Sequence, residues 1–400
     1  MKATALAPRQ CEICGTDVKT PLYRQDFLAV PDGSILSGYD VVACEACGFA
    51  FADHIPDQQT FDAYYEHMSK YEYGHQDGAQ NNFGLERFPD AAAFIASHLP
   101  TARLSVLDIG CSNGGMLNAM KQQGCGSLLG LDPSRACATT ALNLYGIAVR
   151  TGTLFDPPPA LGRFDLVILG AVLEHVRDLR KALSLLCFDY LSAAGCVFVE
   201  VPDAEMFATE PDAPFQEFSV EHINYFSART LQNLFAVAGF ECVALRKSAQ
   251  RQGQSTVCHV IEAIFRRRGE ASPWIKDERI VPALAAYVER SRQIEDGIKS
   301  VIDPLAEDRK PILVWGVGTH TQRLLATSSL RRANIVAYVD SNPRYQGKLL
   351  DGVPIIQPEE IRRQPACPIL ISSRFFQKEI ESRIRQDLRL PNSVILLYQL

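Results

Sequence analysis

The stretch that most constrains the fold runs from Leu104 to Asp132 and alternates short apolar segments with a glycine-containing turn. Apolar residues predict a buried strand at 104–107, and the next residues predict a helix at 116–123. Between them lies the turn Asp108–Gly115, and a second apolar segment ends at Asp132. This order is typical of a βαβ unit. Its glycines let a ligand approach the backbone, and its terminal acid can accept hydrogen bonds from a ribose.

Composition narrows the class of protein. A chain of 400 residues is expected to form two or three domains, and 47% hydrophobic with 22% charged residues is typical of a soluble globular protein. The net charge of −6 argues against a nucleic-acid or membrane-surface partner. The start of the chain lacks the apolar core of a signal peptide, and no apolar run reaches the ~18 residues of a membrane-spanning helix. We therefore expect a cytoplasmic enzyme.

Twelve cysteines without an export signal indicate reduced thiols and a metal site rather than disulfides. Four of them form two matched pairs, Cys11-x-x-Cys14 and Cys44-x-x-Cys47, and each pair is followed by glycine. Four thiolates suit a tetrahedral Zn²⁺ ion, and a closed four-cysteine site has no open position for chemistry. The spacing therefore predicts a structural zinc site, with chance pairs or a redox dithiol as the alternatives.

Aromatic residues follow the second cysteine pair. Phe61, Tyr64 and Tyr65 have helical spacing, which is typical of core residues. Tyr71 and Tyr73 instead lie in a polar, glycine-containing loop. A loop can present a hydroxyl group to a catalytic cleft, so these two tyrosines are candidate catalytic residues.

The alternation of helices and strands continues beyond Asp132. A helix is predicted at 134–145, and strands are predicted at 148–151, 164–169 and 195–201. This order predicts an α/β fold with a mostly parallel, doubly wound sheet. In such a sheet the residues at the carboxyl ends of the strands line the ligand crevice.

The first βαβ unit resembles the first two motifs of class I S-adenosylmethionine (SAM) methyltransferases. The glycine turn of that family matches Gly110, Ser112 and Gly114, and its ribose-binding acid matches Asp132. The alternative is a Rossmann-like unit without a ligand. The resemblance implies SAM as cofactor, with the adenine flanked by the segment after the third strand. The cofactor-binding residues so implied are Asp108, Gly110, Cys111, Ser112, Asn113, Gly114, Asp132, Leu154, Phe155, Asp156 and Gly170.

Two histidines are candidate catalytic residues. His175 lies in the segment Val172–Val176, directly after the strand predicted at 164–169. His222 follows Glu221 in an aromatic segment that precedes a predicted helix. An imidazole can accept a proton near neutral pH, and a carboxylate can orient it. The alternative in both places is a structural role, in which the histidine only packs or the glutamate only pairs.

The whole chain resembles the sugar C-methyltransferases of deoxysugar biosynthesis, which combine a four-cysteine zinc segment, a SAM domain with an Glu-His-x-x-Tyr-Phe motif and a C-terminal Rossmann-like domain. The motif stands here as residues 221–226. The resemblance implies methylation at C-3 of a nucleotide-linked 4-keto-6-deoxyhexose. His222 would be the general base, Glu221 and His175 would assist it, and the loop with Tyr71 and Tyr73 would supply a hydroxyl group.

The chain departs from that family at two places. Ser219 stands where the sugar enzymes carry a tyrosine, and the stretch Arg251–Ser255 replaces a His-Gly-Gly-Ser type segment. Both differences fall near the expected substrate cleft, so they leave the sugar and the methylated atom open. An O- or N-methyltransferase of another small metabolite or glycan precursor is the first alternative. A sugar-nucleotide-binding protein and an oxidoreductase are the others.

The C-terminal part has the same order of sequence features as the first βαβ unit. A strand enters the turn Gly316-Val317-Gly318, and a second strand ends at Asp340. The third glycine of a dinucleotide site is absent, so we expect a non-redox domain that covers the nucleotide end of the substrate. His320 in the turn could contact phosphate or cap the next helix. The predicted domains are a zinc-binding segment at 1–80, a class I methyltransferase domain at 81–265 and a Rossmann-like domain at 270–400.

Overall fold

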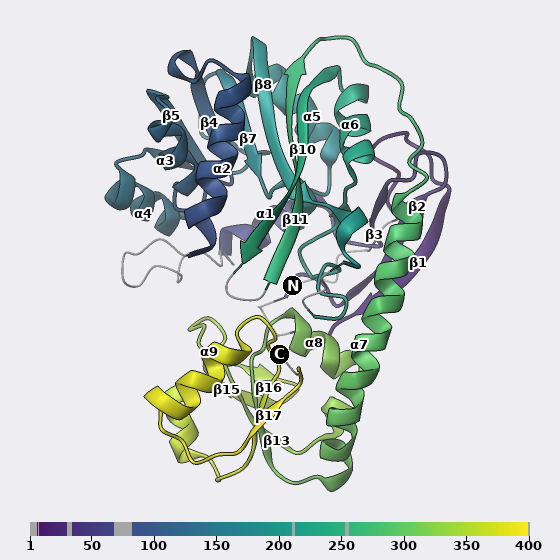
Figure 1. Cartoon of the computed structure of the whole chain (residues 1–400), viewed down its shortest axis with the longest axis vertical. Coiled ribbons are helices and arrows are strands. Elements are labelled where there is room, and N and C mark those ends of the chain that lie inside the picture. Colours follow the sequence, from purple (N-terminus) through teal and green to yellow (C-terminus); the bar gives the residue numbers. More distant parts are fainter. Residues whose placement is uncertain are drawn as a thin grey trace. The chain divides into compact units, whose positions relative to one another are not determined.

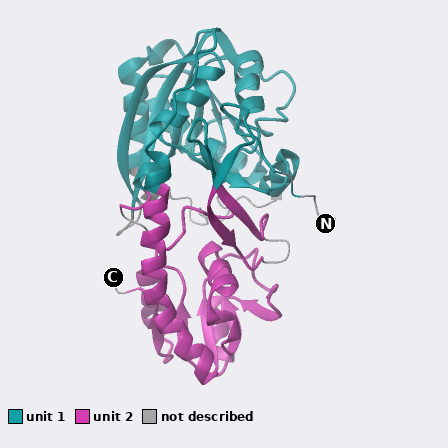
Figure 2. Cartoon of the chain, turned by 90° about the vertical axis from the view of Figure 1, so that its right-hand side faces the viewer, with its two compact units in different colours: residues 1–20, 42–206, 222–283 teal, residues 21–41, 207–221, 284–400 magenta. Residues whose placement is uncertain are grey.

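The computed structural model describes residues 6, 8–29, 34–67, 82–209, 213–252 and 256–398. The chain divides into two compact units (Figure 2). Unit 1 comprises Met1–Thr20, Val42–Met206 and His222–Ala283, and unit 2 comprises Pro21–Val41, Phe207–Glu221 and Leu284–Leu400. The division into domains at 1–80, 81–265 and 270–400 stays a prediction, and each unit is described below by itself.

Unit 1 is built on a seven-stranded sheet with the order β10-β11-β8-β7-β4-β5-β6 (Figure 1). The strands from β8 to β6 pair in parallel, whereas β11 and β10 extend the sheet in antiparallel fashion. This arrangement confirms the expected α/β fold with a mostly parallel sheet. The sequence pattern did not predict the antiparallel pair. The bounds are β4 Ser105–Ile109, β5 Ser127–Asp132, β6 Val149–Thr151, β7 Phe164–Gly170, β8 Leu191–Pro202, β10 Phe240–Gln252 and β11 Thr256–Arg267.

Helices cover both faces of this sheet because its central strands are apolar on both sides. On one face, Val106 and Phe198 pack with α2 (Asn82–His98) and α3 (Gly115–Gln122) in one apolar cluster. On the other face, Leu107 and Val199 pack with α5 (Leu179–Leu185) and α6 (Ala228–Val237). Between β5 and β6 lies α4 (Arg135–Tyr145), which Ser134 caps by accepting a hydrogen bond from the N–H of Cys137.

The zinc-type cysteine pairs belong to the same core as the large sheet. Cys11, Cys47 and Phe49 lie in one apolar cluster with residues of β4, β7 and β8. A four-stranded sheet has the order β1-β2-β3-β9, with β1 at Lys19–Asp26, β2 at Gly38–Cys44, β3 at Ala50–Asp53 and β9 at Asn224–Tyr225. Helix α1 (Gln58–His67) follows β3. The pairing of β3 with β9 brings the segment after His222 next to the segment after the second cysteine pair.

Unit 2 contains a six-stranded sheet with the order β14-β15-β13-β12-β16-β17. All of its pairs are parallel except β14 with β15. Apolar clusters lie on both faces of this sheet, as in unit 1. The bounds are α7 Ile280–Asp308, β12 Ile312–Trp315, α8 Thr319–Thr327, β13 Ile335–Val339, β14 Leu349–Leu350, β15 Val353–Ile356, β16 Ile369–Ile371, α9 Gln377–Ser382 and β17 Val394–Leu396.

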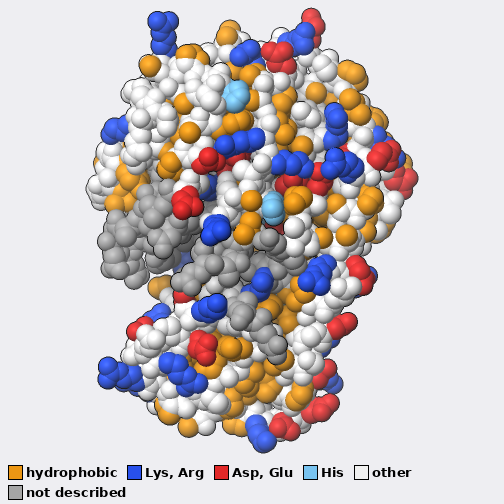
Figure 3. Space-filling model, viewed as in Figure 1, with side chains coloured by type: hydrophobic (Ala, Val, Ile, Leu, Met, Phe, Trp, Pro, Cys, Tyr) orange, Lys and Arg blue, Asp and Glu red, His pale blue; other side chains and the backbone are white. Residues whose placement is uncertain are grey.

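The charges on one face of the molecule and the character of its helices bear on binding to nucleic acids and membranes. On the face that Figure 3 shows, Lys and Arg side chains are interspersed with Asp and Glu side chains. None of the helices in the described ranges combines the length and the apolar character that crossing a membrane requires.

Candidate functional site

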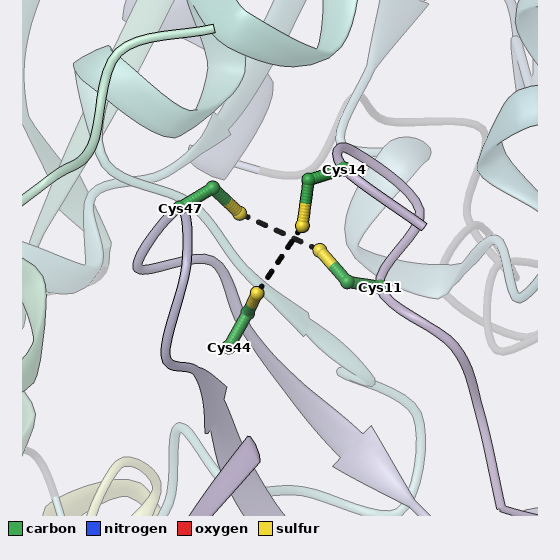
Figure 4. Close-up of side chains that lie close together, drawn as sticks. All are labelled: Cys11, Cys14, Cys44 and Cys47. Carbon is green, nitrogen blue, oxygen red and sulfur yellow. Dashed lines mark hydrogen bonds between the residues drawn. The ribbon is translucent and has the colours of Figure 1, made fainter. Parts of the chain in front are cut away.

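The four cysteines of the two pairs converge on one point (Figure 4). The sulfur atoms of Cys11 and Cys47 lie 3.5 Å apart, those of Cys14 and Cys44 lie 3.4 Å apart, and all four lie within 4.8 Å of one another. A tetrahedron of thiolates with ~2.3 Å bonds to zinc has an edge of about 3.8 Å. The four sulfurs therefore fit a zinc ion, and three of the four cysteines are buried.

The local chain conformation explains why these sulfurs converge. Each pair is followed by a glycine with positive φ, 78° at Gly15 and 85° at Gly48. The N–H of each glycine donates a hydrogen bond to the carbonyl of the first cysteine of its pair, at 2.8 and 2.9 Å. A residue with a side chain adopts this left-handed conformation only at a cost. The glycine thus closes each tight turn and directs two thiols to the same side.

The glycine turn after β4 has the shape expected of a ligand-binding loop. Gly110 has φ of 75°, and a Cβ atom there would lie 3.0 Å from the Cγ2 atom of Val172. Ser112 is also left-handed, with φ of 49°, and Gly114 with φ of 78° precedes α3. The N–H groups of Gly110 and Ser112 donate hydrogen bonds to Leu131 and Asp132, so the turn is held at the carboxyl edge of the sheet, where open α/β sheets bind their ligands.

Asp132 connects this turn to the end of β5. Its Oδ2 atom accepts a hydrogen bond from the N–H of Ser112 at 2.8 Å, and its Oδ1 atom accepts one from the N–H of Ser134 at 2.8 Å. Each carboxylate oxygen can accept more than one hydrogen bond. The carboxylate is thus held in position by the backbone and retains acceptor capacity for the hydroxyl groups of a ribose.

Asp108 lies at the same edge and is buried. Burial and the neighbouring charge of Asp132 raise the pKa of Asp108 to about 8, against a smaller opposing effect from the charge of Arg87. A carboxylic acid whose pKa lies near 8 is mostly neutral at pH 7. A cation bound beside it would favour its ionised form.

An open pocket of about 620 Å³ lies next to the ends of β5 and β6. Of the residues predicted to flank the adenine, Asp156 lines this pocket. Leu154 instead packs in the core, and its carbonyl accepts a hydrogen bond from the hydroxyl of Tyr190, while Phe155 packs against the same core. Among the described residues, the lining comprises Glu66, Pro133, Arg135, Ala136, Thr151, Gly152, Thr153 and Asp156.

The structure brings His175 and His222 together. Their ring centroids lie 4.9 Å apart with the rings at 71° to each other. His175 ends the short 3₁₀ helix Leu173–His175 that follows β7, and His222 lies just before β9. The hydroxyl of Tyr65 lies 3.1 Å from Nδ1 of His175, and the carboxylate of Glu174 lies 3.9 Å from its Nε2.

Two buried polar residues hold the two histidine segments in place. The side-chain amide of Asn224 donates hydrogen bonds to the carbonyls of Leu173 and Val176, at 2.8 and 2.6 Å. The guanidinium of Arg9 donates to the side-chain oxygen of Asn224 at 3.0 Å and to the carbonyl of Ile223 at 3.2 Å. Because Arg9 precedes Cys11 by two residues, the cysteine cluster and the histidine pair belong to one connected structure.

The remaining predicted residues fall in different places. Glu221 belongs to unit 2, where it is buried and its N–H donates to Oγ of Ser219 at 3.3 Å. Tyr71 and Tyr73 lie outside the described residues. Gly170 ends β7, and a Cβ atom there would lie 3.9 Å from Nη2 of Arg87.

Three residues near these groups were missed by sequence reasoning. Tyr65 has the spacing of a core residue in α1, yet its hydroxyl reaches His175. Arg9 and Arg87 stand in no motif of the sequence, so no local pattern marks them. Their positions become apparent only when distant strands lie side by side.

Two protein-family models match parts of the chain. Residues 83–245 match the model of a family described as a methyltransferase domain. Residues 308–396 match a second family model, described as C2185-like, N-terminal. No curated protein matches the chain.

Solved structures are similar to the chain over about half its length. A SAM-dependent methyltransferase from Mesorhizobium loti is 17% identical, covers 45% of this chain and 100% of its own, and has a TM-score of 0.37. A 1,6-didemethyltoxoflavin-N1-methyltransferase from Burkholderia thailandensis, solved with S-adenosylhomocysteine, is 16% identical, covers 56% of this chain and 97% of its own, and has a TM-score of 0.39. A SAM-dependent methyltransferase from Methanosarcina mazei is 16% identical, with coverage of 44% and 98% and a TM-score of 0.36.

The family match and the Rossmann-like sheet define the class of protein. Residues 83–245 therefore form a methyltransferase domain, built on the Rossmann-like sheet of unit 1. The carboxylate of Asp132, held by the backbone, and the open pocket that is lined by Pro133 and by residues after β6 fit a nucleoside-containing cofactor such as SAM.

Proposed function

We propose that this protein is a SAM-dependent C-methyltransferase that methylates C-3 of a nucleotide-linked 4-keto-6-deoxy sugar. The observation that carries the proposal is the pair of imidazoles, His175 and His222, beside the strand end that carries Gly170. The resemblance of residues 221–226 and of the four-cysteine segment to the sugar C-methyltransferases supports the choice of acceptor.

The proposed chemistry begins with a proton on the carbon next to the ketone. His222 removes the C-3 proton, and the electron pair of that C–H bond moves into an enolate. A hydroxyl group or the second imidazole, His175, stabilises the enolate oxygen. SAM supplies an electrophilic methyl group, to which the enolate carbon bonds while the C–S bond breaks and S-adenosylhomocysteine leaves.

The ring of His175 has a neighbour at each nitrogen. The hydroxyl of Tyr65 lies 3.1 Å from Nδ1 of His175, which leaves Nε2 on the side of Glu174. A partner on one ring nitrogen determines which nitrogen carries the proton. Tyr65 is therefore a positioning residue in this proposal, and Glu221 and the two loop tyrosines, Tyr71 and Tyr73, remain predicted assistants.

We also infer that Cys11, Cys14, Cys44 and Cys47 hold a structural Zn²⁺ ion. The convergence of the four sulfurs on one point supports this inference. In the proposed scheme the ion binds no substrate, and its effect on activity passes through the segments that the cysteines hold.

A hydrogen-exchange experiment tests the proposed carbon chemistry. The protein is incubated in D₂O with S-adenosylhomocysteine and a nucleotide-linked 4-keto-6-deoxyhexose, and NMR measures the loss of the C-3 proton signal. We expect exchange with the wild-type protein and a reduction of about 10²–10⁴-fold in His222→Ala. The matched control is His98→Ala, which removes an exposed histidine at the end of α2 and should exchange normally.

The same assay distinguishes the alternative function. If SAM is consumed while the C-3 proton of the sugar does not exchange, and the methyl group is found on oxygen or nitrogen, the protein is an O- or N-methyltransferase. Normal exchange by His222→Ala would remove the assigned role of this residue.

A further inference from the structure

The predicted cofactor residues include no cation for the carboxylate of SAM. Their charged members, Asp108, Asp132 and Asp156, are all acidic. Acids suit the ribose hydroxyls and the ammonium group of the methionine part. They repel its carboxylate, which requires a cation or several N–H donors.

The order of strands indicates where that carboxylate falls. The sheet runs β8-β7-β4-β5-β6, with the pocket at the end of β6 and Asp132 at the end of β5. A ligand with its adenine at β6 and its ribose at β5 extends across β4 towards β7 and β8. The methionine end then lies near Gly170, at the end of β7, and near Glu200, close to the end of β8.

Arg87 stands at this position. It comes from α2, is mostly buried, and forms an ion pair through Nη2 with Oε1 of Glu200. A Cβ atom on Gly170 would lie 3.9 Å from the same Nη2 atom. The Arg87 charge also acts on Asp108 at the end of β4. The guanidinium therefore lies beside the carboxyl-terminal parts of two adjacent strands, β7 and β8.

Glu200 is held so that it can orient this guanidinium. Its other oxygen, Oε2, accepts a hydrogen bond from the side-chain amide of Gln250 at 2.8 Å. A guanidinium has five N–H donors in a planar fork, so one arginine can hold Glu200 and a second carboxylate at the same time.

We propose that Arg87 binds the α-carboxylate of the methionine part of SAM, and that Glu200 and Gln250 orient its guanidinium for this contact. The proposal rests on the use of SAM by this chain and is independent of the methyl acceptor. A buried, charge-assisted contact of this kind contributes about a 10- to 100-fold increase in affinity.

The test compares ligands that differ only at the methionine end. Isothermal titration calorimetry measures the affinity of S-adenosylhomocysteine, of its decarboxylated amine analogue and of 5′-methylthioadenosine, which lacks the whole amino acid. In Arg87→Gln we expect S-adenosylhomocysteine to bind about 10- to 100-fold more weakly. The affinities of the two ligands without a carboxylate should change less than about twofold, because the lost contact is absent from them.

A variant of a second arginine, Arg246, serves as the control for the loss of a structural ion pair. Arg246 also pairs with a buried glutamate of this sheet, Glu262, through Nε and Nη2, and with Asp90 of α2. Arg246→Gln should leave the ratio of the three affinities unchanged. If Arg87→Gln does not fold, Arg87→Lys can replace it, because lysine keeps the charge but lacks the planar guanidinium. We expect Arg87→Lys to show a smaller loss of affinity that is again selective for S-adenosylhomocysteine.

Four results would contradict the proposal. An equal loss for all three ligands in the Arg87 variants, or a selective loss in Arg246→Gln as well, would mean that Arg87 acts only through the structure. Unchanged binding of S-adenosylhomocysteine would also reject it. If the wild-type protein binds none of the ligands, the use of SAM fails first, which distinguishes that failure from a wrong role of Arg87.

Discussion

Two glycine turns in this chain share their backbone scaffold, one after β4 in unit 1 and one after β12 in unit 2. Gly110 and Gly316 have positive φ, 75° and 109°, and the N–H of each donates at 2.8 Å to the carbonyl of the residue before the acid. Asp132 and Asp340 each accept hydrogen bonds from a backbone N–H of the glycine turn and from the N–H two residues further on, at 2.8 to 2.9 Å.

The two turns differ in the side chains around them. In unit 1 the acid that holds the turn, Asp132, directly precedes Pro133, which lines an open pocket of about 620 Å³. The turn of unit 2 is packed by its own chain, because His320 is buried against the hydroxyl of Tyr398 at 2.7 Å and Thr321 lies 2.5 Å from Oγ of Ser372. Burial lowers the pKa of His320 to about 3, so this imidazole is neutral at pH 7.

In both turns the acid and the glycine belong first to the fold. A strand that passes into a helix through a tight turn leaves backbone N–H groups that need acceptors, and the acid on the next strand supplies them. Ligand binding depends on what the neighbouring segments place over the turn. The hydrogen bonds of the turn and the binding of a ligand can therefore be changed independently.

The largest expected difference lies between Asp132→Ala and Asp340→Ala. Loss of two charge-assisted hydrogen bonds to the ribose should weaken binding of S-adenosylhomocysteine by at least about 100-fold in Asp132→Ala. Asp340→Ala should change that affinity less than about twofold, because its carboxylate serves only its own turn. Calorimetric titration of both variants gives the result, and equal losses in the two would end the comparison.

Removal of zinc should disturb the histidine segments of unit 1 and leave the glycine turn of unit 2 unchanged. Arg9, two residues before Cys11, donates hydrogen bonds to the carbonyl of Ile223 and to Asn224 beside the histidine pair. Without the ion these segments lose their support, and we expect methyl transfer to fall at least about tenfold. Hydrogen-exchange mass spectrometry should show lost protection at 171–177 and 222–226 and unchanged protection at 312–340.

The zinc content of the protein tests the structural role of the four cysteines directly. Thiol-reactive release with colorimetric detection should yield one zinc ion per chain. If the protein contains no zinc, or if the metal-free protein keeps full turnover, the structural role assigned to the four cysteines is wrong.

The smallest expected effect concerns the pH dependence of stability at Asp108. Its folded-state pKa of about 8 lies above its ordinary value, so the folded chain binds more protons than the unfolded chain. The stability that its neutral form contributes is complete below about pH 4 and is lost as the pH rises through about 8. We expect Asp108→Asn, which stays neutral, to flatten the decline of the melting temperature between pH 5 and pH 8. An unchanged slope would contradict a buried neutral acid at this turn.

Much of the scaffold was predictable because its determinants are local. The cysteine pairs with their glycines predicted the metal-type cluster, and the alternation of apolar strands with helices predicted the parallel sheet. The antiparallel strands β10 and β11 were missed, since their pairing depends on a sheet edge that no short segment reveals. Of the residues predicted to flank the adenine, Asp156 lies at the pocket, whereas Leu154 lies in the core.

Spacing and residue type identify the residues that could close a tight turn, bind a metal or end a strand with an acid, because these properties are local. Only the tertiary structure decided that His175 and His222 lie side by side, that Arg9 supports them, and that Arg87 stands over the strand ends near Gly170. These groups come from segments far apart in the chain, and their proximity follows from the strand order and the packing of helices on the sheet, which no local pattern encodes.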